Sequence, residues 1–238
     1  MGAGRSDDLP FDQRIDDGNS LVIDSEPLDQ PIELLGAPKL ILEIASDKPI
    51  AQICARLCDV APDGSSRRVS YQVLNLTHRN SHEHPEKLEP GTFYRVELTL
   101  NDCGYIFDKN HRVRIALSSV YWPLVWPAPE LATLQIKTQE CSLGLPVRMS
   151  QQEDVSVRFD KPVVNHRCPI TTLSPRKIER YGNLDLLSGK ATYVTDEKGE
   201  KFILDDIQTM LSHDVRRELS IDVYDPLSAS QIVTQKLS

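Results

Sequence analysis

Three histidines in one short segment are the first residues whose types and spacing could do chemistry. His78, His82 and His84 lie within seven residues, with Glu83 between the last two. In an extended segment His82 and His84 would share a face, and two neutral imidazoles on one face are the start of a zinc or copper site. The following Pro85 and acidic residues are typical of a solvated loop. We therefore expect exposure or structural hydrogen bonding and no bound cofactor, with metal binding as the alternative.

An aromatic segment is the second candidate site. Both tryptophans of the chain, Trp122 and Trp126, lie in one proline-rich stretch together with Tyr121. One interpretation is a loop folded over the core. The other is a rigid aromatic surface that contacts a partner domain or lines a substrate pocket, because such side chains lose little entropy on contact.

A charged segment near the N-terminus is the third candidate. Arg14 lies between Asp12 and the pair Asp16 and Asp17. These residues form either a charged surface lead-in or an ion-pair clasp to a neighbouring domain, and the sequence leaves both interpretations open.

The motifs that build common active sites are missing from this sequence. It contains no G-x-S-x-G nucleophile elbow, no G-x-G-x-x-G, no Walker A loop, no H-E-x-x-H and no EF-hand loop. We therefore expect the chain to have no hydrolytic activity of its own.

The elements that must position these residues are strands. Residues 95–100 and 111–117 alternate strictly between apolar and polar side chains, and 39–45 is an almost continuous apolar run. Pro-Asp-Gly at 62–64 predicts a turn between two further strands. The other expected strands are 20–24, 51–60, 68–76, 131–138, 142–148, 217–224 and 230–237, with a hairpin of 190–195 and 201–204 and a helical turn at 208–213.

This pattern predicts an all-β protein, a jelly-roll β-sandwich with a smaller β-rich C-terminal extension. The expected boundaries are a lead-in at 1–19, the sandwich at 20–148 and the extension at 149–238. The last expected strand runs into the C-terminus, which hints at truncation.

Composition limits the function classes. The 238 residues are 39% hydrophobic and carry a net charge of −8, so the chain can bury a core, and neither nucleic acid nor a membrane is expected as its partner. We see no signal peptide and expect a cytoplasmic protein. The five scattered cysteines, without C-x-x-C, are expected to be reduced and mostly buried.

A set of short motifs follows a fixed order along the first part of the chain, at residues 12–17, 20–22, 35–38, 57–64, 88–91, 104–107, 111–119 and 121–123. These motifs resemble one family region, the C-terminal non-catalytic domain of the CocE/NonD hydrolases, a group that includes cocaine esterase, X-Pro dipeptidyl-peptidase and α-amino-acid ester hydrolases. Residues 10–148 carry the resemblance well, and 149–238 resemble more loosely a β-rich extension of longer members.

The resemblance implies a galactose-binding-domain-like sandwich that braces an α/β-hydrolase core. In such enzymes the core carries the Ser, Asp and His, and one sandwich loop reaches toward the acyl site. Residues 118–126 match that loop, which favours a functional role for Tyr121 and Trp122. The region that would hold the triad is missing here, so the implied partner is a separate or absent catalytic domain, and the exposed aromatic loop predicts self-association.

Two other hypotheses remain open at this point. One is a free-standing sandwich module that binds carbohydrate or peptide through its loops, which rests on fold analogy alone. The other is a metal-dependent enzyme built on His78, His82 and His84.

Overall fold

The computed structural model describes residues 12–149, 160–163, 170–199, 201–204 and 213–237. The chain divides into two compact units, Met1–Ser150 and Gln151–Ser238. Each unit is built on antiparallel β-sheet, and the protein is all-β as its alternating sequence predicts. In the part of the chain that is described, no helix is both long and apolar enough to cross a membrane.

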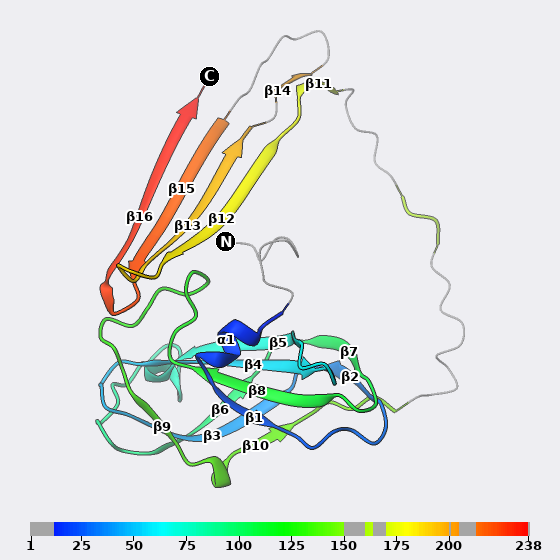
Figure 1. The fold of residues 1–238 in the computed structure, drawn as a ribbon, viewed down its shortest axis with the longest axis vertical. Helices are drawn as coiled ribbons and strands as arrows, with labels where there is room; N and C mark the ends of the chain where they lie inside the picture. Colours follow the sequence, from blue (N-terminus) through cyan, green and yellow to red (C-terminus); the bar gives the residue numbers. More distant parts are fainter. Residues whose placement is uncertain (1–11, 150–159, 164–169, 200, 205–212, 238) are drawn as a thin grey trace. The chain divides into compact units, whose positions relative to one another are not determined.

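The first sheet of unit 1 has four antiparallel strands in the order β1-β8-β4-β5 (Figure 1). Apolar and polar residues alternate at 68–73 and 112–115, in two of its strands, which suits a sheet with one face in the core. Its strands are β1 (Leu21–Asp24), β4 (Gln52–Val60), β5 (Ser66–Asn75) and β8 (Arg112–Ser118).

The second sheet of unit 1 is centred on β3 (Lys39–Ser46), which pairs with three strands. Two smaller elements, β2 (Ile32–Gly36) and β7 (Cys103–Phe107), pair with each other, and β2 also forms an isolated bridge between Leu34 and Val147. The partners of β3 are β6 (Tyr94–Thr99), β9 (Leu134–Ile136) and β10 (Ser142–Gly144), and short 3₁₀ turns occur at η2 (Leu76–His78) and η3 (Thr138–Glu140).

The two sheets pack face to face and enclose one hydrophobic core, as a β-sandwich does. Alternate residues of β3, β4, β6 and β8 supply it, with contributions from β2 and β7. Its most deeply buried apolar members include Leu42, Ile44, Ile53, Leu57, Val96, Leu98, Phe107 and Leu117.

Strand β4 is buried along its whole length, so both of its faces are covered. Ile53, Ala55 and Leu57 point into the core, and the alternate residues, Arg56 among them, point to the opposite face. On that opposite face lie residues 12–19 of the lead-in, which contain the single short helix α1 (Arg14–Gly18) of the described residues (Figure 1). This described part of the lead-in is therefore packed on the sandwich.

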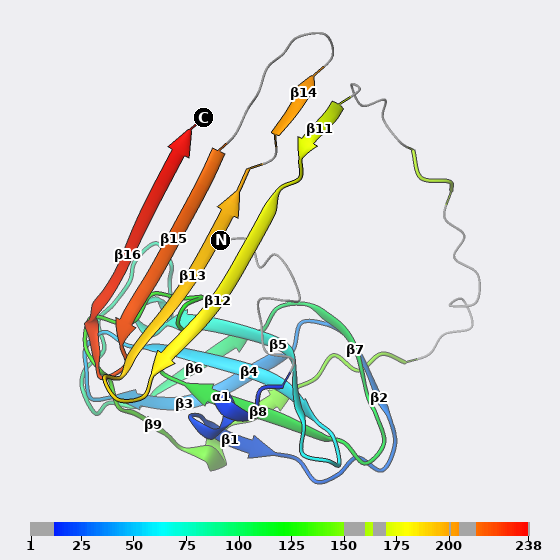
Figure 2. The same ribbon diagram turned by 45° about the horizontal axis from the view of Figure 1, so that its top comes forward.

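Unit 2 contains a four-stranded antiparallel sheet in the order β12-β13-β15-β16 (Figure 2) and a separate two-stranded pair, β11-β14. The long strands are β12 (Lys177–Asp185), β13 (Lys190–Lys198), β15 (His213–Asp222) and β16 (Asp225–Leu237), and the short ones are β11 (Ile170–Ser174) and β14 (Lys201–Leu204).

The hairpin expected between 190–195 and 201–204 is wrong. Strand β13 pairs instead with β12 and β15, whereas β14 pairs with β11. The turn that decides this pairing is 185–190, where Asp185 accepts backbone hydrogen bonds and Gly189 adopts φ +71°. This turn joins nine paired residues on each side, and β13 continues to Lys198, through residues where the expected hairpin would have turned. The helical turn expected at 208–213 lies largely outside the described residues, and β15 begins at His213.

Candidate functional site

The loop that follows β8 is anchored by Tyr121. Its ring lies on Tyr71 of β5, with 5.5 Å between ring centroids and 56° between ring planes, and its hydroxyl accepts a hydrogen bond from the Arg68 guanidinium. Burial raises the pKa of the Tyr121 hydroxyl, which therefore stays protonated at neutral pH. Tyr121 thus points inward and fixes the loop to the outer face of the first sheet.

Arg68 is the cation of this anchor. Its guanidinium carbon lies 4.5 Å from the centroid of Tyr71 and 5.9 Å from that of Tyr121, within the range of cation–π attraction. Within the described ranges, its contacts are these two rings and the phenol, with no carboxylate among them. The three side chains form one unit that joins β5 to the loop.

The other large apolar side chains of the loop are exposed to different degrees. Trp126 is 51% exposed and Leu124 is 37% exposed, whereas Trp122 is half-buried. The backbone NH of Val125 donates to the carbonyl of Tyr121 at 2.9 Å, which closes a compact turn. The loop therefore presents apolar side chains on a backbone that is already ordered.

A buried ion pair lies on the same outer face. The Arg56 guanidinium is 3.1 Å from the Asp17 carboxylate, and the two residues are only 1% and 5% exposed. Arg56 also donates to the side chains of Gln13 at 2.9 Å and Ser20 at 3.0 Å. These bonds satisfy a charge that would otherwise be costly to bury, and they fasten the lead-in to β4.

Asp17 has two further partners. Its carboxylate accepts hydrogen bonds from Ser66 at 2.6 Å and from Arg114 at 3.0 Å. Arg114 in turn binds Asp24 through two bonds of 2.7 Å, an arrangement that raises the pKa of Arg114 and lowers that of Asp24. One carboxylate of α1 thereby connects three strands of the sheet.

The charged residues of the lead-in separate into two roles. Asp12 and Arg14 bind each other, and the Arg14 side chain is 61% exposed. Asp17 is engaged inside unit 1. Asp12 also accepts a hydrogen bond from the backbone NH of Ser66 at 3.2 Å, so both carboxylates bind to unit 1. The clasp of Asp12, Arg14 and Asp17 to a neighbouring domain stays a prediction.

The histidine segment does not converge on a common point. The rings of His78 and His82 are tilted against each other with 5.4 Å between centroids, and the side chain of His84 is 82% exposed beside Glu83. No group of three or more potential metal ligands forms among the residues that the structure describes. The geometry therefore gives the metal-enzyme hypothesis no support.

A second titratable cluster was missed from the sequence. His111 Nδ1 lies 2.8 Å from the carboxylate of Asp59, and the Tyr105 hydroxyl donates to the same carboxylate at 2.8 Å. An Asp–His pair is part of a hydrolase triad. Here Tyr105 binds the carboxylate, whereas the nucleophile of a triad binds the imidazole, so Tyr105 does not take the nucleophile's position. Burial also raises the pKa of its hydroxyl to about 12, so the phenol stays protonated at neutral pH.

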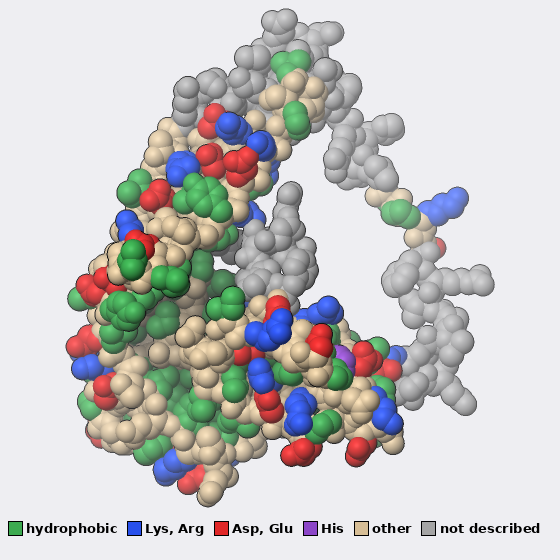
Figure 3. Space-filling view, viewed as in Figure 1, with side chains coloured by type: hydrophobic (Ala, Val, Ile, Leu, Met, Phe, Trp, Pro, Cys, Tyr) green, Lys and Arg blue, Asp and Glu red, His purple; other side chains and the backbone are tan. Residues whose placement is uncertain are grey.

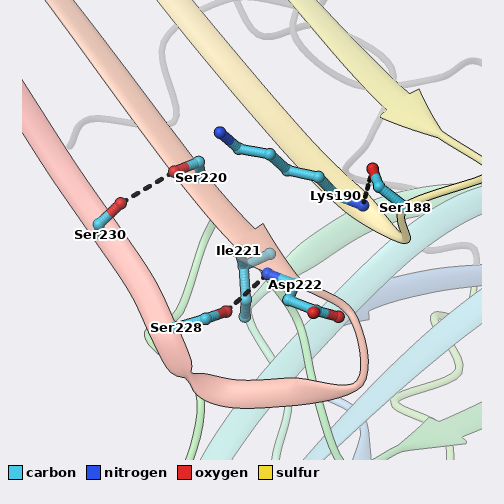
Figure 4. A pocket seen from close by; sticks show the side chains of 7 residues that line it. All are labelled: Ser188, Lys190, Ser220, Ile221, Asp222, Ser228 and Ser230. Atoms are coloured by element: carbon cyan, nitrogen blue, oxygen red, sulfur yellow. Dashed lines mark hydrogen bonds between the residues drawn. The ribbon is translucent and has the colours of Figure 1, made fainter.

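Unit 2 carries an open pocket of about 410 Å³ at the turns of its sheet (Figure 4). Three serine hydroxyls that line the pocket are engaged in hydrogen bonds within unit 2. Ser220 and Ser230 share a hydrogen bond of 2.8 Å, and the Ser228 hydroxyl accepts a hydrogen bond from the backbone NH of Asp222 at 2.6 Å. These hydrogen bonds connect β15 to β16. The pocket is lined by Ser188, Lys190, Ser220, Ile221, Asp222, Ser228 and Ser230.

Comparison with known proteins identifies the relatives of unit 1. Residues 4–158 match the family described as the X-Pro dipeptidyl-peptidase C-terminal non-catalytic domain. The chain is 28% identical over 119 residues to the cocaine esterase of Rhodococcus sp. (strain MB1 Bresler), and this match covers 49% of the chain and 21% of the esterase.

Two solved structures share this fold. An α-amino acid ester hydrolase matches with a TM-score of 0.55 and 25% identity, over 59% of this chain and 28% of the hydrolase. An aminopeptidase from a marine sediment Thaumarchaeota archaeon matches with a TM-score of 0.54 and 19% identity, over 59% of this chain and 28% of the aminopeptidase. The chain thus spans between about a fifth and just over a quarter of the length of these relatives.

Proposed function

Because this chain belongs to the family of X-Pro dipeptidyl-peptidase C-terminal non-catalytic domains, we propose that it serves as the accessory β-sandwich of a CocE/NonD-type serine hydrolase. In this role unit 1 braces an α/β-hydrolase catalytic domain, supplied by the same protein or by a separate chain. The chain itself performs no hydrolysis.

The family match is the observation that carries this proposal. It covers residues 4–158, which include the whole described sandwich, and the family is described as non-catalytic. The matched relatives are several times longer than the segment they share with this chain, so their activity resides in a polypeptide of which this sandwich is a small part.

The absence of catalytic chemistry in the sequence supports the same conclusion. There is no G-x-S-x-G motif, and in the Asp59–His111 pair Tyr105 binds the carboxylate and not the imidazole, where a triad nucleophile would lie. Acyl transfer needs a nucleophile activated by a neighbouring base. A catalytic domain with its own nucleophile must therefore supply the reaction.

The loop of residues 118–126 is the part of the sandwich best suited to reach the substrate pocket or the domain interface. Tyr121 fixes it to the sheet, while Trp126 and Leu124 remain exposed and Trp122 is half-buried. Ordered aromatic side chains bind with a small entropic cost. We assign this loop to contact with the catalytic domain and with an acyl or peptide substrate.

The test has two parts. The purified chain is assayed with a chromogenic acyl ester, and we expect no saturable turnover; turnover that a covalent serine inhibitor abolishes would overturn the proposal. Tryptophan fluorescence is then followed while an α/β-hydrolase core of the family is added. A shift is expected with the core, whereas quenching by glycans or peptides alone would favour a free-standing binding module.

A further inference from the structure

Unit 2 has a feature that the proposed function does not use, namely the open edge of its four-stranded sheet. The family match ends at residue 158, so this sheet lies beyond the matched domain. Within the described residues, strand β16 pairs with β15 on one side and with no strand on the other (Figures 1 and 2). An unpaired edge exposes a row of backbone donors and acceptors that another strand can bind.

The central part of the edge strand lacks the features that normally prevent such pairing. Natural proteins protect sheet edges with charges, prolines or bulges. In β16, Asp225, Pro226 and a shift in register against β15 lie at the start of the strand, and Lys236 lies near its end. Residues 230–235 between them contain no charge and no proline and pair regularly with β15, and Ile232 and Val233 are 62% and 44% exposed.

The opposite edge of the same sheet is different. Strand β12 carries Lys177, Glu179 and Arg180, and Lys177 and Glu179 form an ion pair. On the face of unit 2 that Figure 3 presents, hydrophobic side chains lie among charged ones. The charges of β12 oppose strand addition, so the two edges differ and β16 is the one open to a partner.

We propose that β16 pairs with β16 of a second copy of this chain, in antiparallel register about a two-fold axis. Such pairing places the uncharged stretch of one protomer against the same stretch of its partner, so no like charges meet. The interface is isologous and closes at a dimer with an eight-stranded sheet. Pairing of β16 with β12 of another copy would instead leave edges free and grow into filaments.

The first experiment measures the mass of the full chain in solution by sedimentation velocity across a concentration series. The chain has a mass of 26.8 kDa, and we expect a reversible species of twice that mass. A monomer at all concentrations up to the order of 100 µM, where even weak dimers become populated, would overturn the proposal. Filaments or larger polymers would overturn the two-fold arrangement.

The second experiment places a charge on each edge in turn. Ile232→Lys puts a lysine on β16 opposite Glu218 of β15, which keeps the sheet itself stable. We expect this variant to raise the dimer dissociation constant by roughly tenfold or more. Leu184→Lys on β12 is the matched control, because Leu184 is 51% exposed on the other edge, and it should leave dimerisation unchanged.

A mixing experiment separates edge pairing from association through the aromatic loop. Ile232→Lys and Ile232→Glu chains should each be weakened, and their mixture should dimerise again because opposite charges meet near the axis. Circular dichroism verifies that both variants are folded. A dimer that resists Ile232→Lys but is lost in Trp126→Ser would place the interface on the loop and overturn the proposal.

Discussion

Arg56 and Asp17 form an ion pair of 3.1 Å although both residues are almost fully excluded from water. Arg56 lies in the middle of the most deeply buried strand, and Asp17 belongs to the short helix of the lead-in. The pair therefore connects a peripheral segment to the centre of the sandwich. The pair lies on the outer face of the first sheet, the same face to which Tyr121 fixes the loop that follows β8.

Removal of Asp17 should destabilise unit 1 strongly. Asp17→Ala leaves Arg56 without its carboxylate partner in a buried site and also removes a partner of Arg114. We expect the free energy of unfolding to fall by about 3–5 kcal/mol. Urea denaturation measures this loss. Glu97→Ala is the control, because the Lys39–Glu97 pair of 3.2 Å is exposed on both sides, and little change is expected; equal losses in both variants would contradict the role of the buried pair.

Replacement of Tyr121 should release the aromatic loop. Tyr121→Ala removes both the ring contact with Tyr71 and the acceptor for Arg68, so Trp122 should become more exposed and its fluorescence should shift to the red. Tyr121→Phe keeps the ring contact and should cost only about 1 kcal/mol, as expected for one hydrogen bond. Emission spectra that are identical in all three proteins would show that Tyr121 does not hold the loop.

Stability should decline at alkaline pH because of two buried thiols. Burial raises the pKa of Cys54 from 9.0 to about 11 and that of Cys58 from 9.0 to about 12. Above pH 9 the unfolded chain releases these protons while the native chain retains them, so the unfolded state is favoured as pH rises. Unfolding free energies measured between pH 8 and pH 11 should fall, and Cys58→Ala should reduce the slope; an unchanged slope would contradict this assignment.

A methyl group at Gly189 should disrupt the β12–β13 hairpin. Gly189 has φ +71°, and an added Cβ would lie 2.8 Å from the Tyr224 ring, so Gly189→Ala is both strained and crowded. We expect loss of strand signal from unit 2 in circular dichroism, with unit 1 retained. Gly182→Ala is the matched control on the same hairpin, because its Cβ would meet atoms no closer than 3.9 Å. Equal effects of the two substitutions would argue against the crowding.

The all-β class followed from alternation, which a half-buried strand must show, together with one apolar run and one turn motif. Strands β6 and β8 lie where alternation predicts them, β3 lies at the apolar run, and β4 and β5 flank the Pro-Asp-Gly turn. Strands β2 and β7 were missed because their patterns are weak: Leu35 and Ile106 are more than half exposed, and both strands contain glycine. In unit 2 strands β13 and β14 lie where the sequence predicts them, but the prediction that they pair with each other was wrong.

The sequence by itself determined the fold class, the family resemblance and the aromatic segment that contains Tyr121. Only the tertiary structure decided which side chains meet. Arg56, Asp17 and Arg114 are distant in sequence, and a single arginine within an apolar strand was the one local signal of their contact. The physical reason is that local periodicity sets which face a residue occupies, whereas the partner of a buried charge is set by sheet pairing and by the segment that covers the sheet.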